Sequence, residues 1–174
     1  RFHLRVLTLY LNNLIVEIDK VNLDYFDTES KKNKFQILRK QKNEYLIDGS
    51  LFNSNKLIDN LLKSKKKNNS KLFKNDLDLV LNLKEVYLND ESIIKNLKGK
   101  INIKDNKVFF ADIFGNFNKA DNLKFTLNTN KDGQKVTTFF SSRAKPIVSR
   151  YEFIKGYDEG YLDFYSSKKD GKSK

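Results

Sequence analysis

The feature that most constrains the fold is a strict alternation between Leu77 and Leu83, where leucine occupies every odd position. Successive side chains of a β-strand point to opposite faces, so this pattern predicts a strand with one apolar face. The next apolar residues, Val86 and Leu88, are out of phase with these leucines by one residue. One extra residue near Lys84-Glu85 would produce this change, which predicts a β-bulge there.

Similar short segments recur along the chain, and turn-forming pairs such as Asp105-Asn106 and Asp132-Gly133 separate some of them. Strands are predicted at 14–18, 34–39, 44–52, 97–103, 108–111, 113–117, 123–129, 136–142 and 160–165. Many short strands with frequent turns are typical of an all-β meander. The sequence therefore predicts a mainly β fold with antiparallel strands.

Two short α-helices are predicted to interrupt the strands. The first follows the capping pair Ser54-Asn55 and places its apolar residues on one side: Leu57, Ile58, Leu61 and Leu62. The second has Pro146 in its first turn and ends at Gly156. Between the first helix and the leucine strand, residues 63–71 are expected to form a polar, lysine-rich loop.

The residue types needed for common enzyme chemistry are scarce. The sequence has no cysteine and a single histidine, His3, which argues against cysteine nucleophiles, Ser-His-Asp arrangements and histidine metal sites. It has no glycine-rich phosphate-binding motif. The carboxylate pairs Asp76/Asp78 and Asp158/Glu159 lie on a solvated strand face and in a turn, where nothing places them across a cleft. We therefore predict a non-enzymatic protein without a cofactor or metal.

The sequence carries a formal net charge of +12, from 34 Lys and Arg residues against 22 Asp and Glu residues. This surplus reflects either a solvated, lysine-rich composition or a functional basic face, and both interpretations stay open. Phe109-Phe110 and Phe139-Phe140 could stack on bases, but neighbouring residues of a strand face opposite ways. The glycines of an RNA-recognition motif are also missing, so no nucleic-acid partner is expected.

No apolar run approaches the ~18 residues that a membrane-spanning helix needs. The chain begins at Arg1 and contains no methionine. We expect it to be part of a longer polypeptide whose membrane anchor or export signal lies outside this sequence.

From Tyr45 to Ser167 the order of motifs resembles the AsmA-like family, specifically the C-terminal region of large AsmA-type envelope proteins related to YhdP and TamB. A strand that ends in Gly-Ser-Leu-Phe comes first and is followed by a helix, a polar gap, the leucine strand, a glycine strand and a Phe-Gly-Asn-Phe motif. The positions that carry the match are Gly49, Gly99, Gly115, Ala144, Gly156, Gly160 and Leu162. Arg143, Lys145 and Glu159 depart from the family's ending.

The resemblance implies a curved, groove-like sheet (a β-taco) in a periplasmic bridge that is tethered to the inner membrane of a Gram-negative bacterium. Phospholipid would move along its apolar groove toward the outer membrane. Residues 1–44 would continue strands from an upstream region, 45–167 would form the groove region, and 168–174 would be a disordered polar tail. The implied partners are phospholipid or another lipid, a membrane reached through an anchor outside this sequence, and an unidentified envelope protein.

The residues expected to line the groove are Leu77, Leu79, Leu81, Leu83, Ile101 and Ile103. The same alternation also fits a closed core, in which these side chains pack against one another. A structural or assembly module with such a core is therefore the first alternative, and a nucleic-acid-binding domain is the second.

Overall fold

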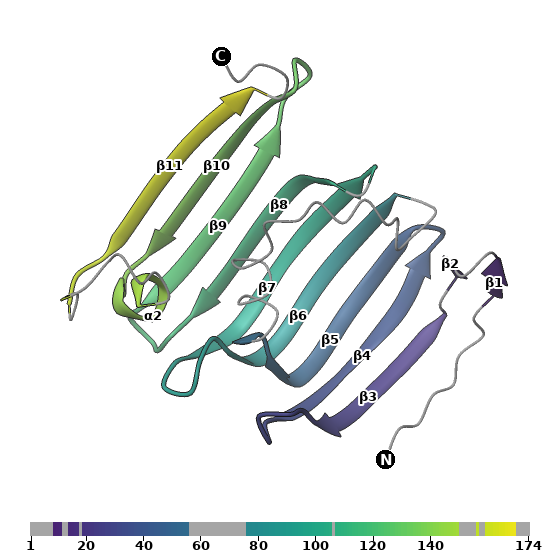
Figure 1. Ribbon diagram of the computed structural model, residues 1–174, viewed down its shortest axis with the longest axis horizontal. Coiled ribbons are helices and arrows are strands. Elements are labelled where there is room, and N and C mark those ends of the chain that lie inside the picture. Colours follow the sequence, from purple (N-terminus) through teal and green to yellow (C-terminus); the bar gives the residue numbers. More distant parts are fainter. Residues whose placement is uncertain are drawn as a thin grey trace.

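Strand pairing dominates the computed structural model, which describes residues 9–11, 14–17, 19–55, 76–105, 107–149, 156 and 159–169. Nine strands lie side by side in one open sheet in the order β11-β10-β9-β8-β7-β6-β5-β4-β3 (Figure 1). The sheet comprises β3 (Lys20–Phe26), β4 (Lys32–Gln41), β5 (Glu44–Asn53), β6 (Leu77–Tyr87), β7 (Ile93–Lys104), β8 (Lys107–Asn116), β9 (Asn122–Thr129), β10 (Gln134–Ser141) and β11 (Leu162–Lys169). The expectation of a mainly β fold is confirmed.

A separate antiparallel pair is formed by β1 (Leu9–Leu11) and β2 (Leu14–Glu17). The one helix that the described residues contain in full is α2 (Lys145–Val148), between β10 and β11, with Pro146 in its first turn. The predicted first helix, Leu57–Leu62, and the lysine-rich loop 63–71 lie outside the described residues. In the described part of the chain, no helix is long and apolar enough to cross a bilayer.

The predicted meander is antiparallel at every pairing of the large sheet except one. Strands β5 and β6 are parallel, with Ile47 opposite Leu81. The chain leaves β5 at Asn53 and enters β6 at Leu77, so the intervening segment returns it to the end of the sheet where β5 began. Parallel neighbours always need such a crossover, whereas antiparallel neighbours need only a turn. The expectation of a purely antiparallel arrangement was wrong at this pairing.

The predicted boundary after residue 44 falls at the start of β5, which pairs with β4 along its length. The sheet is therefore continuous across this boundary. At the other end of the chain, β11 reaches Lys169, two residues into the segment that was predicted to be a tail. The predicted Asp132-Gly133 turn connects β9 to β10, and Gly133 has a φ of 73°.

The register divides the sheet into an apolar face and a polar face. Residues directly opposite each other on neighbouring strands share a face, and Leu79 pairs with Ile101, which pairs with Ala111. On the other face, Gln36 Nε2 and Asn82 Nδ2 both donate to the Asp48 carboxylate, at 3.2 and 2.6 Å. Each face therefore has its own kind of cross-strand contact.

The change of phase predicted near Lys84 is present, because Leu83 and Val86 are both buried in one cluster although they are three residues apart. The neighbouring strands β5 and β7 have the same change of phase. Relative to β4, strand β5 has an extra residue at Ser50, and relative to β8, strand β7 has one at Asn96, whose φ is 52°. Because β5, β6 and β7 bulge together, their mutual register continues unbroken through the irregularity.

The tightly packed part of the molecule lies at the end of the sheet where this bulge occurs. Its buried cluster consists of Leu83, Val86, Leu88, Ile94, Phe117 and Leu123. Helix α2 contributes Ile147 to the edge of the cluster and also buries Pro146 and Val148. We call this region the packed end.

The turn between β3 and β4 is anchored to the packed end by a polar network. Asp27 Oδ1 accepts the backbone N–H groups of Glu29 and Lys31 at 2.9 and 3.0 Å. Its Oδ2 accepts the side-chain amides of Asn33 and Asn53 at 3.1 and 2.8 Å. Asn33 is 1% exposed, and its Oδ1 accepts the backbone N–H of Asn53 at 2.8 Å. One carboxylate thus joins the turn to β5.

The same network changes the acidity of Asp27. Burial by itself raises the pKa of this carboxyl, but hydrogen bonds from Asn53, Lys31, Glu29 and Asn33 outweigh burial and lower it below 3.8. The contribution of ionised Asp27 to the free energy of unfolding is therefore fully present above the ordinary pKa of 3.8. It is lost as the pH falls through the lower pKa of the folded state.

We expect Asp27→Asn to reduce the fall in stability that the wild type shows between about pH 5 and pH 2, since the substituted residue does not titrate. Urea denaturation at a series of pH values measures this dependence. Asp132→Asn, in the exposed β9–β10 turn, is the matched control. If the free energy of unfolding depended on pH identically in wild type and Asp27→Asn, protonation of Asp27 would not contribute to the loss of stability in acid.

Gly99 is required by the close approach of β8. A Cβ atom at this position would lie 2.5 Å from the backbone oxygen of Asp112 and 2.9 Å from the Cα of Ile113. Such contacts with backbone cannot be relieved by turning a side chain, so a strand would have to move.

We expect Gly99→Ala to lower the free energy of unfolding by about 1–3 kcal/mol, through overpacking. Chemical denaturation measures the change, and Lys98→Ala on the same strand, which removes only an exposed side chain, should stay close to wild type. Equal stabilities for Gly99→Ala and Lys98→Ala would contradict the close approach.

Candidate functional site

The six residues predicted to line a groove come together on the apolar face of β6 and β7. Leu77 lies opposite Ile103, and Leu79 lies opposite Ile101. The remaining two leucines pair with residues outside the predicted set: Leu81 with Gly99 and Leu83 with Leu97. The alternation in the sequence therefore placed all six on one continuous surface.

These six residues differ in burial along the strands. Leu83 is 6% exposed and belongs to the packed end. Leu77, at the opposite end of β6, is also 6% exposed but lies outside that cluster. Between them Leu79 and Leu81 are half-buried, as are Ile101 and Ile103 on β7. The middle of the apolar face is thus less tightly enclosed than the packed end.

The largest continuous feature of this face is a row of apolar residues that crosses all nine strands. Each member lies directly opposite the next: Val21, Ile37, Ile47, Leu81, Gly99, Ile113, Phe125, Phe139 and Phe164. We call this set the apolar row. With strands about 4.8 Å apart, it extends for roughly 40 Å.

No member of the apolar row is fully buried. Eight of its nine residues are half-buried, and Phe164 on the edge strand β11 is 46% exposed. Phe125 and Phe139 contact each other edge to face, with ring centroids 6.2 Å apart. Among the described residues the large sheet has no second sheet packed on it, since the other strands form only the pair β1–β2.

The positions of the family-like motif fall into two groups. Gly49, Gly99 and Gly115 lie on the apolar face, where Phe35, Ile113 and Ile94 occupy the space that their side chains would fill. The other four surround the start of β11: Ala144, Gly156, Gly160 and Leu162.

The second group is connected through the backbone. The N–H of Ala144 donates to the carbonyl of Gly160 at 2.8 Å, and Ala144 is 1% exposed. Gly156 and Gly160 have φ values of 77° and 106°, which favour glycine. These residues therefore shape the connection from α2 to β11 and do not line the apolar row.

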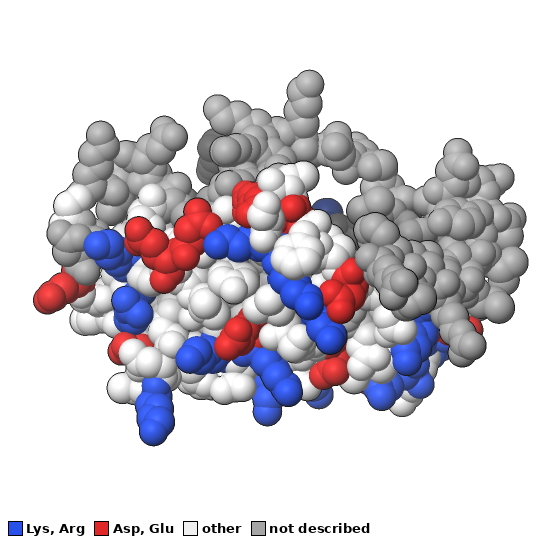
Figure 2. Space-filling model, turned by 90° about the horizontal axis from the view of Figure 1, so that it is seen from below, with Lys and Arg blue, Asp and Glu red and all other residues white. Residues whose placement is uncertain are grey.

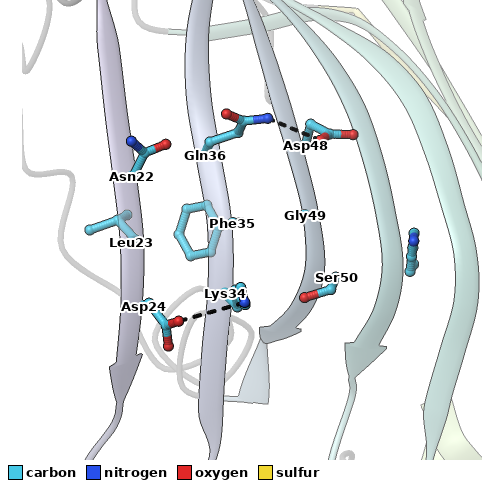
Figure 3. A pocket seen from close by; sticks show the side chains of 10 residues that line it. Asn22, Leu23, Asp24, Lys34, Phe35, Gln36, Asp48, Gly49 and Ser50 are labelled. Atoms are coloured by element: carbon cyan, nitrogen blue, oxygen red, sulfur yellow. Dashed lines mark hydrogen bonds and ion pairs between the residues drawn. The ribbon is translucent and has the colours of Figure 1, made fainter. Parts of the chain in front are cut away.

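The polar face carries an open hollow of about 500 Å³ over β3 to β6 (Figure 3). Its charged and amide groups already engage one another, with Lys34 Nζ 3.8 Å from an Asp24 oxygen and Gln36 donating to Asp48. Asn22, Ser50 and Lys84 complete the polar lining. The hollow mixes both signs of charge and shows no convergent set of groups for one ligand.

Charge is also mixed at the packed end. Figure 2, seen from below, shows Lys and Arg side chains beside Asp and Glu side chains with no area of a single sign. Lys31 Nζ, for example, lies 3.1 Å from an Asp90 oxygen. In the described part of the chain, no group of three or more His, Cys, Asp or Glu residues is placed to hold a metal ion.

Sequence reasoning missed most of the apolar row. The period-two signal is visible at Leu123, Phe125 and Leu127, but nothing in the sequence says that these residues continue the surface of Leu81. That continuity depends on the register, which the sequence does not give. The comparisons supply no further guide: no family model, curated protein or solved structure matches this chain.

Truncation of single leucines distinguishes the packed end from the half-buried middle. We expect Leu83→Ala to lower the free energy of unfolding by about 2–5 kcal/mol, because it opens a cavity in a packed cluster. Leu81→Ala should cost roughly 1–2 kcal/mol, since a half-buried side chain loses less contact on truncation. Urea denaturation measures the free energy of unfolding of the two variants, both on β6, against the wild type. Equal large losses would mean that the apolar row is sealed as tightly as the packed end.

Proposed function

We propose that this chain is a segment of an AsmA-like envelope protein and that its apolar face forms the wall of a groove for lipid hydrocarbon. The observation that carries the proposal is the apolar row, in which nine residues cross the sheet without one polar interruption and without one fully buried member. A surface of this kind suits a guest with a long, uniform and apolar shape.

Hydrocarbon transfer supplies the physical reason for such a wall. A lipid chain that leaves a bilayer exposes its methylene groups to water at about 0.8 kcal/mol each, or on the order of 13 kcal/mol for about sixteen carbons. Contact with an apolar wall removes most of this barrier without any covalent chemistry. The function we propose is therefore non-enzymatic, and the direction of movement has to come from another component.

The two faces of the sheet fit this role differently. The polar face has cross-strand hydrogen bonds such as Asn82 to Asp48, and it suits contact with water. The apolar face would curve inward as the inner side of a β-taco. In the full-length protein, residues outside this sequence would tether the bridge to the inner membrane, and the phospholipid would travel through the periplasm toward the outer membrane.

One observation favours a second candidate function. The cluster around Leu83, Val86 and Phe117 is a packed hydrophobic core, as a structural or assembly module of the envelope would have. If the same packing extended over the apolar row when the whole polypeptide is assembled, the module would hold no lipid. The two candidates therefore differ in whether a guest molecule reaches Leu81.

Native mass spectrometry of protein purified without detergent tests the groove. We expect lipid adducts on the wild type and their loss in Leu79→Lys plus Leu81→Lys, because a charged amine in the wall is costly to cover with hydrocarbon. The matched control is Val80→Lys plus Asn82→Lys, which adds the same two amines to the polar face of the same strand and should keep the adducts.

Two outcomes would count against the groove. Wild-type protein without adducts, and without uptake of added phospholipid, would favour the structural module. Equal loss of adducts in both double variants would show that lipid binding follows total charge or folding and not the apolar face. Circular dichroism of each variant establishes that the sheet is retained.

A further inference from the structure

The ends of β7 to β11 that lie opposite the packed end are neighbours in the sheet (Figure 1), and several of their residues are lysines. Six lysines lie in the first or last two residues of these strands or in the turn between β9 and β10: Lys104, Lys107, Lys131, Lys135, Lys168 and Lys169. We call this set the lysine tip. Five of the six are exposed and Lys135 is half-buried.

The arrangement of the lysine tip brings like charges together. Lys104 lies directly opposite Lys107, and Lys135 lies directly opposite Lys168. Like charges in directly opposed positions of a sheet destabilise it. Two such pairs at one end of a sheet carry a local cost that an anion placed between them would offset.

Carboxylates at this end do not neutralise the lysines. The described ones are Asp105 and Asp132 in the turns and Asp76, whose Oδ1 accepts the backbone N–H of Asp105 at 3.1 Å. In the described part of the chain, none of the six lysines makes an ion pair with a carboxylate. This differs from the packed end, where Lys31 pairs with Asp90.

Exposed apolar side chains stand beside the lysine tip on β8. Val108 and Phe110 are each 37% exposed and lie within a few residues of Lys107. A register shift separates them, so Phe110 lies opposite Asn102 on the polar face and Val108 lies opposite Ile103 on the apolar face. Lys104 Nζ lies 4.5 Å from the centroid of the Phe109 ring. Lysines beside exposed aromatic and aliphatic groups match the boundary between lipid headgroups and acyl chains.

We propose that the lysine tip, with Val108 and Phe110, docks on an anionic lipid surface. Basic residues near such a surface gain attraction from its negative potential, and the phosphates would separate the opposed lysines. A nucleic-acid backbone would satisfy the same charges, but it offers no apolar layer for Val108 and Phe110. This inference concerns a surface separate from the apolar row, so either can fail alone.

Vesicle flotation with the whole chain tests the proposal. The tip variant replaces Lys107, Lys131, Lys168 and Lys169 by serine, which removes one lysine from each opposed pair. The control variant replaces four other exposed lysines by serine: Lys84, Lys98, Lys119 and Lys124. Both lose the same charge, and the vesicles contain phosphatidylcholine alone or with about one third phosphatidylglycerol.

We expect the wild type to bind only the anionic vesicles, less tightly as salt is raised, and the tip variant to bind at least about tenfold more weakly. The control variant should stay within about threefold of wild type. Thermal unfolding at low salt should show the tip variant at least as stable as wild type, since like charges have been removed. Leu79→Lys plus Leu81→Lys should keep vesicle binding even if its lipid adducts are lost.

Three results would overturn the proposal. Equal weakening in the tip and control variants would assign binding to net charge alone. Wild-type protein that binds neutral and anionic vesicles equally well would show that the lysines do not attract the protein to the membrane. Binding to duplex DNA that is tighter than to anionic vesicles, and that the tip variant loses, would identify a nucleic-acid surface in its place.

Discussion

In a single sheet, the register between strands decides which side chains share a face. A slip of one residue between two neighbours would turn every apolar side chain of one strand to the polar side. Here the register holds across nine strands, so that Val21 on β3 and Phe164 on β11 belong to one uninterrupted row. The apolar face, the polar hydrogen bonds around Asp48 and the location of the packed end all depend on that alignment.

The register is most easily lost at the bulge that β5, β6 and β7 share. Strands β5, β6 and β7 each change phase at the same level, through Ser50, Lys84 and Asn96. Without the change of phase, Val86 would face away from Leu83, and if β6 alone changed phase, Val86 would lose its pairing with Ile94. Because the three strands change together, Leu83 and Val86 contribute to one cluster and the packed end can form on the same side as the apolar row.

The sequence predicted local features well and long-range features poorly. Alternation located the strand at Leu77, the change of phase near Lys84 and the turn at Asp132-Gly133, because each depends on a few neighbouring residues. It did not predict the parallel pairing of β5 with β6, which depends on where the chain re-enters the sheet. Of the six residues predicted to line a groove, Leu81 is the one that belongs to the apolar row, and the extension of that row to Phe125 and Phe139 required the register.

The parallel pairing of β5 and β6 also bears on how the molecule assembles. Strands β3 to β5 are joined by short turns, and so are β6 to β10, which makes two units whose contacts are mostly local. Their junction, by contrast, closes the long segment between Asn53 and Leu77, and contacts between residues distant in the chain form more slowly. We therefore expect the strands within each unit to pair first and the pairing of β5 with β6 to limit the rate of folding. Until then the unpaired edges of β5 and β6 are open to aggregation.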